Sequence, residues 1–328
     1  MGVAWGILST AEINAPVLAG AAESDKADVI AVASREQSRA ALYARENGIE
    51  RAYGAYDALL EDGDVEAVYI SLPNGMHAGW SMRALEAGKH VLCEKPFSRR
   101  ATDVEQAFDA AERADRLLME AFMYRHNPQT RRLTELVEQG AIGRLRHVRS
   151  AFSFAMDDPD VNVRNNAELE GGALMDVGCY CISGSRLLAG EPLHVYGERE
   201  TGDSGVDVRF AASMRFAGDV TAQFDCGIVL FGRDELEAVG DEGALFLDDP
   251  WHCREPAIEL RTAGDGRSAK VERIETDLAH SYRLELENLS DAIRGQAEPL
   301  LGRADALGQA RAIEALYRSA EEGRAIPI

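Results

Sequence analysis

The first third of the chain alternates short apolar runs with amphipathic segments. The apolar runs cover residues 3–8, 29–33, 67–71, 90–93 and 117–121. The segments between them, such as residues 38–47 and 101–114, repeat apolar positions every three or four residues, which is typical of helices. Strands that are apolar on both faces and alternate with helices predict a parallel sheet covered on both sides. We therefore predict a doubly wound (Rossmann) α/β domain over residues 1–122.

The pattern changes near residue 144, where apolar and polar positions begin to alternate. Alternation typical of strands covers residues 146–154, 194–198, 206–216, 220–224, 235–239 and 257–261. Turns such as Ala217-Gly218-Asp219 favour antiparallel pairing. Helical patterns cover residues 128–138, 174–188, 282–294 and 303–321. Residues 123–328 are therefore predicted to form an α+β domain on a large, mostly antiparallel, open-faced sheet, and whether its C-terminal helices pack back on the first domain stays open.

Composition narrows the class of protein. The chain has 328 residues, of which 46% are hydrophobic, so it can bury a large core and is neither disordered nor fibrous. A formal net charge of -21 argues against nucleic-acid partners and anionic membranes, which require a basic surface. The opening residues lack a basic leader and no stretch reaches about 20 apolar residues, so we expect a cytoplasmic protein with no membrane association.

Cysteine and histidine give no sign of a metal site. The five cysteines show no Cys-x-x-Cys spacing, and the seven histidines form no pattern of metal ligands. We expect the cysteines to be reduced and buried, and we expect no metal. The spacing further suggests that His126 caps the helix that begins at Pro128.

The turn after the first strand occupies the position of a dinucleotide-binding loop but lacks the glycines of its usual sequence motif. A G-x-G-x-x-G motif would put glycine at positions where this chain has Ser9, Ala11 and Asn14. Small Ser9 and Ala11 still let the backbone approach a pyrophosphate, although an ordinary strand-to-helix turn is an equal alternative. The residues expected to bind the pyrophosphate are Ser9, Thr10, Ala11, Glu12 and Ile13.

The end of the second strand indicates which dinucleotide is bound. NAD enzymes usually carry a carboxylate there for the ribose 2′-hydroxyl, whereas this chain has Ser34 and Arg35, followed by Arg39. A hydroxyl and a guanidinium suit a 2′-phosphate. We therefore expect NADP, with NAD possible; the alternative is a surface arginine at the start of a helix.

Two further segments carry residues suited to proton transfer. Lys95 follows the strand at residues 90–93 and precedes Pro96, at the carboxyl end of the predicted sheet. Asp176 and Tyr180 follow the paired glycines 171 and 172 and lie four residues apart, so they share one face of a helix. Taken singly, a lysine before proline is usually a solvated loop residue and a helical tyrosine is usually part of the core.

Together these segments resemble the glucose-fructose oxidoreductase / inositol dehydrogenase (Gfo/Idh/MocA) family. The resemblance spans nearly the whole chain and is carried by residues 6–14, Ser71-Leu72-Pro73-Asn74 with His77, Glu94-Lys95-Pro96, residues 120–125 and residues 171–180. It is greatest to the branch of dimeric dihydrodiol dehydrogenases, xylose dehydrogenases and glucose-fructose oxidoreductase, which often prefers NADP. The resemblance adds Ser71, Leu72, Pro73, Asn74, His77, Glu94 and Lys95 to the expected cofactor-binding residues.

The resemblance also implies catalytic roles. Lys95 would lie between nicotinamide and substrate, Asp176 would hold a substrate hydroxyl, and Tyr180 would exchange the proton. Hydride loss from an alcohol carbon needs such a base, and a tyrosine, which titrates near 10, needs a neighbouring cation to act as one. We also expect a cis bond before Pro96 and possible substrate contacts from Phe154 and Arg164.

The predicted function is an NADP-dependent oxidoreductase that transfers a hydride between nicotinamide and a carbonyl or alcohol carbon of a sugar, polyol or dihydrodiol. One alternative keeps its nicotinamide bound and cycles it between two sugars, or assists glycoside cleavage. Another is a dinucleotide-binding sensor without turnover. The family implies a homo-oligomer, a dimer or tetramer, and an uncovered apolar sheet face would favour such pairing. The sequence identifies neither the substrate nor the direction of the reaction.

Overall fold

The computed structural model describes residues 2–159, 161–264 and 269–328. The chain divides into two compact units. The first unit comprises Met1–Met123 and His280–Leu307, and the second comprises Tyr124–Ala279 and Gly308–Ile328. The segment His280–Leu307, which lies in the predicted 123–328 domain, thus belongs to the first compact unit, while the functional boundary at residue 122 stays a prediction.

The first unit is built on a parallel sheet of six strands in the order β3-β2-β1-β4-β5-β6. The strands are β1 (Val3–Leu8), β2 (Ala27–Ala33), β3 (Arg51–Tyr53), β4 (Ala67–Ile70), β5 (His90–Glu94) and β6 (Leu118–Ala121). Strand order reverses between β1 and β4, and ligands of doubly wound sheets bind at that point, beyond the carboxyl ends of the strands.

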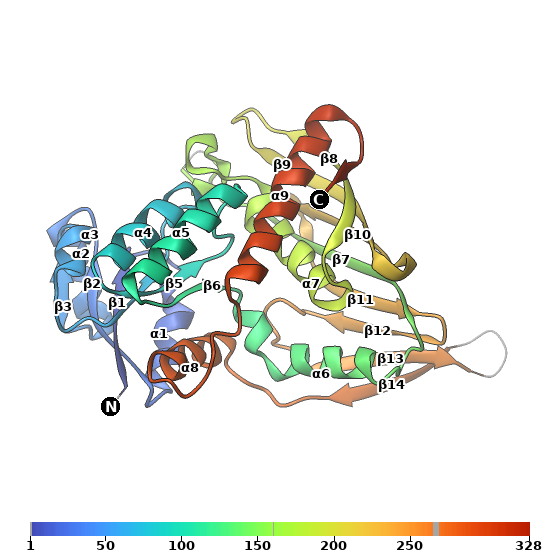
Figure 1. Ribbon diagram of the computed structural model, residues 1–328, viewed down its shortest axis with the longest axis horizontal. Coiled ribbons are helices and arrows are strands. Elements are labelled where there is room, and N and C mark those ends of the chain that lie inside the picture. The colour runs from blue at the N-terminus through green and yellow to red at the C-terminus, as the bar shows by residue number, and fades with distance from the viewer. Residues whose placement is uncertain (1, 160, 265–268) are drawn as a thin grey trace. The chain divides into compact units, whose positions relative to one another are not determined.

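Amphipathic helices accompany this sheet (Figure 1). In α5, for example, Val104, Ala107, Phe108 and Ala111 recur at helical spacing and are buried. Helix α4 packs on α5, and α1 packs on α8. The helices are α1 (Asn14–Ala22), α2 (Gln37–Asn47), α3 (Tyr56–Leu60), α4 (His77–Glu86), α5 (Ala101–Ala114) and α8 (Ser281–Ile293).

The second unit is built on a sheet of nine strands in the order β14-β13-β12-β11-β7-β10-β9-β8-β15. Neighbours pair antiparallel except β7 and β10, which are parallel. The strands are β7 (Leu145–Ala155), β8 (Pro192–Thr201), β9 (Asp207–Phe216), β10 (Thr221–Gly227), β11 (Val229–Gly240), β12 (Gly243–Asp248), β13 (Ala257–Ala263), β14 (Ala269–Glu275) and β15 (Ile326–Pro327). The predicted fold class, a Rossmann domain plus a mostly antiparallel sheet domain, is confirmed.

Helices accompany the second sheet, and the one expected from residue 174 is not regular throughout. It begins as a π-helical turn, Leu174–Gly178, and becomes α-helical only as α7 (Cys179–Ala189). Helix α6 (Pro128–Glu138) contacts β13, and α7 contacts β7, β10 and β11. The boundary between the units falls within α9 (Arg303–Glu322).

The expectation of an apolar uncovered sheet face is wrong. On β7, the ring of Phe152 contacts Tyr180 of α7, and alternation turns neighbouring Arg149 to the opposite face. Arg149 is exposed there and pairs with Glu235, and on neighbouring strands Arg233 pairs with Asp225. Charged side chains therefore occupy this part of the opposite face. A homo-oligomer stays a prediction that rests on the family resemblance alone.

The five cysteines are buried and unbonded, as expected. Within the described residues, every helix is too short or too polar to cross a bilayer.

Candidate functional site

Ser9, at the first missing glycine position, adopts a backbone conformation that normally requires glycine. Its φ is 136°, which for a residue with a side chain carries strain of about 1–3 kcal/mol. Hydrogen bonds offset this strain: Ser9 Oγ lies 2.8 Å from Ser71 Oγ and 3.1 Å from the Ser71 carbonyl, and it accepts from the Ala11 amide at 3.1 Å. The turn thus keeps a glycine-like path without the glycine.

Asn14, at the last motif position, completes this network. Its Nδ2 donates to the Ser9 carbonyl at 3.0 Å, and its Oδ1 accepts from Ser71 Oγ at 2.6 Å. All three side chains are buried at the ends of β1 and β4, where strand order reverses. Because their polar atoms bond to one another, these three side chains fix the shape of the turn.

The rest of the turn is accessible from solvent. Thr10, Ala11 and Ile13 are partly exposed and Glu12 is fully exposed. The amides of Asn14 and Ala15 at the start of α1 donate to the carbonyls of Ala11 and Glu12 at 3.1 and 3.0 Å, and Pro16 has no amide hydrogen, so the first residues of the helix already use their donors. The predicted pyrophosphate-binding residues therefore share one accessible turn at the switch point of the sheet.

Two guanidinium groups lie near this turn. Arg39 Nε donates to Thr10 Oγ1 at 2.7 Å, and Arg35 is exposed. Burial raises the pKa of Tyr56, while the charges of Arg35 and Arg39 lower it. Both guanidinium groups therefore lie near Tyr56. Ser34, by contrast, is buried, and its amide donates to the Tyr53 carbonyl. Two cations after β2, with Ser34 directly following the strand and Glu36 at the N-cap of α2, suit an additional phosphate.

Glu94 has an internal role rather than an exposed one. Its side chain is buried, its Oε1 accepts a short hydrogen bond from the Tyr69 hydroxyl, and its Oε2 accepts from the Lys95 amide at 3.3 Å. Burial, reinforced by the charge of Glu94, raises the pKa of Glu285 well above its usual range. The Glu94 carboxylate thus anchors the main chain from which Lys95 projects.

His77 connects the two loops that follow β4 and β5. Its Nδ1 lies 2.9 Å from the Pro96 carbonyl and its Nε2 lies 2.7 Å from the Leu72 carbonyl. Burial lowers its pKa to about 4. The bond between Lys95 and Pro96 is cis, as predicted. His77 therefore braces the loop that carries Lys95, which is itself half-buried, while Pro73 and Asn74 on the neighbouring loop are partly exposed.

In the second unit, Tyr180 lies at the start of α7 within an aromatic cluster. Its ring centroid is 5.4 Å from that of Phe152 and 5.9 Å from those of Tyr124 and Trp251. Only 6% of Tyr180 is exposed, so the ring is fixed by packing. The π-helical turn that carries Asp176 directly precedes this residue, and such turns are frequent at functional sites.

The two residues proposed for substrate binding are Phe154, near the end of β7, and Arg164, on the long loop that follows it. Arg164 Nε donates to Asp176 Oδ2 at 2.7 Å, and the guanidinium lies 5.7 Å from the centroid of the Phe154 ring. The structure therefore brings Phe154, Arg164 and Asp176 together.

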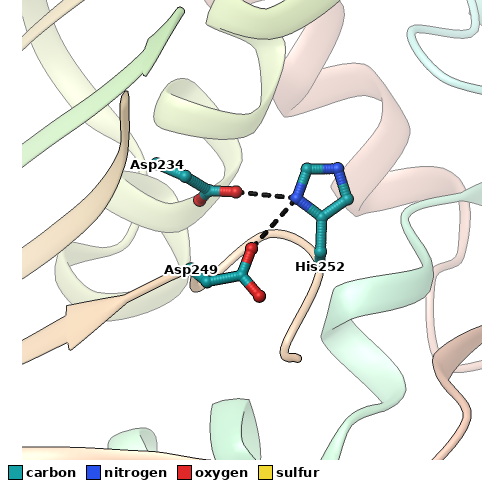
Figure 2. A group of neighbouring side chains, drawn as sticks. All are labelled: Asp234, Asp249 and His252. Carbon is teal, nitrogen blue, oxygen red and sulfur yellow. Dashed lines mark hydrogen bonds and ion pairs between the residues drawn. The ribbon is translucent and has the colours of Figure 1, made fainter. Parts of the chain in front are cut away.

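A charged cluster near these aromatic residues was not predicted from the sequence. His252 Nδ1 lies 2.7 Å from Asp234 Oδ2 and 3.1 Å from Asp249 Oδ1 (Figure 2). The His252 ring packs edge-on against Phe152. Burial alone would lower the pKa of His252, but the hydrogen bonds to Asp234 and Asp249 raise it to about 9. Asp249 and His252 share one loop, whereas Asp234 comes from β11, so sequence spacing gave no complete signal.

These side chains have the types and spacing of metal ligands, but their charges are already balanced. Arg254 donates to Asp249 through Nη2 at 2.7 Å and Nε at 3.0 Å, so a guanidinium occupies the carboxylate that a metal ion would need. We interpret the cluster as an ion-pair network that fixes the loop between β12 and β13.

The expected capping role of His126 is wrong. The cap of α6 is Asn127, whose side chain accepts from the Gln129 amide, because a short carboxamide reaches that group where a ring does not. His126 is buried, and burial lowers its pKa to about 3.

Comparison with known proteins agrees with this geometry. A family described as "Oxidoreductase family, NAD-binding Rossmann fold" matches residues 5–122, and "GFO/IDH/MocA C-terminal domain" matches residues 130–246. The chain is 38% identical to D-xylose 1-dehydrogenase (NADP(+)) 2 of Haloferax volcanii over 99% of both chains. It is 32% identical to trans-1,2-dihydrobenzene-1,2-diol dehydrogenase of Danio rerio over 77% of this chain and 76% of that protein.

A solved structure extends the similarity to the full fold. Aldose-aldose oxidoreductase from Caulobacter crescentus, complexed with glycerol, is 27% identical over 100% of both chains with a TM-score of 0.91. Models of both domains match this chain, and the similarity to relatives spans its whole length. The chain belongs to the Gfo/Idh/MocA family of NAD(P)-dependent oxidoreductases.

Proposed function

We propose that this enzyme is an NADP-dependent dehydrogenase or reductase that acts on a CH–OH group of an aldose or a related polyhydroxylated substrate. The observation that carries the cofactor assignment is the pair of exposed guanidinium groups, Arg35 and Arg39, after β2, where the residue that directly follows the strand is Ser34 and the carboxylate of Glu36 comes only at the N-cap of α2. The proposal for the substrate is supported by whole-length similarity to an enzyme named D-xylose 1-dehydrogenase (NADP(+)) 2.

The proposed roles follow from the chemistry of each side chain. Bound NADP accepts or supplies the hydride. Tyr180 takes the hydroxyl proton during alcohol oxidation and returns a proton to the oxygen during carbonyl reduction. The ammonium group of Lys95 favours the phenolate form of Tyr180. Asp176 accepts a hydrogen bond from a substrate hydroxyl, and Arg164, whose Nε donates to its carboxylate, fixes its orientation.

The accessible turn at Thr10, Ala11, Glu12 and Ile13 is proposed to bind the pyrophosphate through main-chain groups. Ser9, Ser34 and Ser71 support it from buried positions. Leu72, Pro73, Asn74 and the brace made by His77 and Glu94 are proposed to border the nicotinamide side of the same unit.

A second candidate keeps its cofactor bound and couples the oxidation of one aldose to the reduction of another. The similarity to an aldose-aldose oxidoreductase over the full length supports it. In that case the purified protein would carry nucleotide, and transfer between two sugars would need no added NADP.

Turnover with each substrate class is the direct test. We expect absorbance at 340 nm to change with NADP and one or more aldoses, with dihydrodiols and inositols as the compared classes. A protein without nucleotide that turns over none of them with either cofactor would contradict the proposal.

Tyr180→Phe tests the chemical step, since it keeps the ring in its aromatic cluster and removes only the hydroxyl. We expect turnover to fall by at least about a hundredfold, the scale of a lost acid–base group, at unchanged thermal stability. A wild-type rate in the folded variant would assign Tyr180 to the core alone.

A further inference from the structure

A buried carboxylate lies at the start of the segment that carries Asp176 and Tyr180. Asp207, the first residue of β9, is only 3% exposed. Its Oδ2 accepts from the amide of Leu174, the first residue of the π-helical turn, at 2.7 Å. Its Oδ1 accepts from the hydroxyl of Tyr317 on α9 at 2.8 Å. One carboxylate thus fastens the turn to a strand and to a helix.

The paired glycines of the sequence explain how this contact is possible. Gly172 has a φ of 119°, and a Cβ atom there would lie 2.3 Å from Asp207 Oδ1. A Cβ on Gly171 would lie 2.3 Å from the Arg164 carbonyl. Both glycines therefore let the main chain approach its neighbours more closely than any side chain would permit.

Gly172 also connects this contact to the predicted site residues. Its carbonyl accepts from the Asp176 amide at 2.9 Å, and its own amide donates to the Arg164 carbonyl at 2.9 Å. The backbone before Asp176 is therefore held at two points. The Arg164 carbonyl accepts from the Gly172 amide, and Asp207 accepts from the Leu174 amide.

We propose that Asp207 is a positioning residue: its carboxylate holds the start of the π-helical turn so that Asp176 and Tyr180 keep the orientation that the reaction requires. This inference rests on the proposed function, in which those two residues act on the substrate.

The electrostatics show that the ionised form of Asp207 carries a cost in the fold. Burial raises its pKa to about 6, although the bonds from Leu174 and Tyr317 and the charge of Arg199 act in the opposite direction. A folded-state pKa above the ordinary value means that folding favours the protonated form, so ionised Asp207 lowers the stability of the fold at neutral pH. A group that lowers stability while holding a site is typical of function.

The groups around Asp207 come from several elements. Tyr317 belongs to α9 and Arg199 to β8, and the Arg199 guanidinium lies 5.8 Å from the Tyr317 ring centroid. Cys226 of β10 is buried close enough for the charge of Asp207 to raise its pKa, after burial itself. Asp207 is the group among these whose pKa lies near 6. Burial also raises the pKa of Asp234, in the separate cluster with His252, to about 6, so the comparison with Asp207→Asn assigns an acid-side change to Asp207.

The test uses Asp207→Asn and Asp207→Ala in the full-length enzyme. Asparagine can accept from Leu174 and donate to Tyr317 but does not titrate, whereas alanine removes both bonds. Rates are measured for carbonyl reduction, in which Tyr180 donates a proton, so acidification does not remove the form of Tyr180 that this direction uses.

We expect the wild-type kcat to fall as pH drops through about 6, since protonation removes the negative charge that strengthens both accepted hydrogen bonds. Asp207→Asn, whose neutral amide resembles the protonated carboxyl, should show no such fall and should keep the lower rate of the acidic wild type at every pH. Asp207→Ala should lose at least about tenfold in kcat with little change in the Kd for NADP. Amide exchange at Leu174 and Asp176 should accelerate in Asp207→Ala, a readout independent of activity. Asp219→Asn, an exposed carboxylate after β9, is the matched control.

Three results would overturn the inference: a wild-type kcat in Asp207→Ala, a flat wild-type profile between pH 7 and 5, or an acid fall that persists in Asp207→Asn. If Asp207→Ala does not fold, the asparagine profile still decides. Failure of the proposed function would be seen separately, as an unaffected rate in Tyr180→Phe.

Discussion

The two units hold their candidate residues in opposite ways. At the switch point of the first unit, Ser9, Asn14 and Ser71 are buried and bond to one another, so they fix the path of the main chain that is proposed to bind the cofactor. In the second unit, a main-chain hydrogen bond holds Asp176, and aromatic contacts hold the ring of Tyr180. A phosphate can be bound by backbone amides that every residue offers, whereas proton transfer needs particular side chains. This difference explains why other residues can stand at the glycine positions of the motif, whereas the proposed catalytic step needs an aspartate and a tyrosine at positions 176 and 180.

Lys95→Met should have the largest effect, because it removes a side chain with a proposed chemical role from the unit that is otherwise proposed to bind through its backbone. We expect turnover to fall by at least about a hundredfold, because Tyr180 loses the cation that favours its phenolate. The affinity for NADP should change little. Steady-state kinetics and isothermal titration separate the two effects.

Lys270→Met is the control, since Lys270 is exposed on β14. Near-normal turnover in Lys95→Met, or equal losses in both variants, would contradict the proposed role of Lys95.

Arg35→Asp tests a second side chain of the first unit, because Arg35 is proposed to contact the 2′-phosphate through its guanidinium group and not through its backbone. Charge-assisted hydrogen bonds to a 2′-phosphate contribute about 1.5–3 kcal/mol, or about ten- to a hundredfold in affinity. Arg35 is exposed, so the lower half of that range is expected. Titration should show NADP weakened about tenfold and NAD nearly unchanged.

Arg45→Asp, in the last turn of α2, the helix that follows Arg35, matches the change in charge. If NAD binds the wild type as tightly as NADP, the assignment of NADP is wrong and the family assignment is unaffected.

Ser9 gives the smallest expected effect and tests the backbone side of the comparison. Glycine would relieve the strain of the φ of 136° but lose the bonds to Ser71, worth about 0.5–1.5 kcal/mol each, so Ser9→Gly should be nearly neutral. Ser9→Val keeps the strain, loses the bonds and should destabilise the fold by about 2 kcal/mol or more. Chemical denaturation measures both, and a strongly destabilised Ser9→Gly would show that the network outweighs the strain.

Much of the fold was predictable because it follows from periodicity. Continuous apolar runs identified five strands of the first sheet, but β3 and α3 are too short to carry a pattern. Strand β14 was missed because its side chains are almost all exposed, so it has no alternation of buried positions. The polar opposite face of the second sheet was missed because the argument considered apolar surface and not the charges at alternate positions.

The candidate site was predictable only in part. Local motifs indicated Lys95, Asp176 and Tyr180, and the structure brings Arg164 and Phe154 to Asp176. The roles of Glu94 and His77 as buried supports depend on the partners Tyr69, Leu72 and Pro96, which sequence spacing does not specify. Asp207 likewise had no signal, since its partners Leu174 and Tyr317 are far from it in the chain.

The network of Ser9, Asn14 and Ser71 also has a consequence for how this turn can change over generations. Ser71 Oγ bonds to both Ser9 and Asn14, so exchanging Asn14 or Ser71 alone leaves a donor or acceptor unpaired at a cost of about 1–3 kcal/mol. At position 9 glycine also relieves the backbone strain, which offsets the lost bonds. Positions 14 and 71, on separate segments, should therefore be inherited and replaced together.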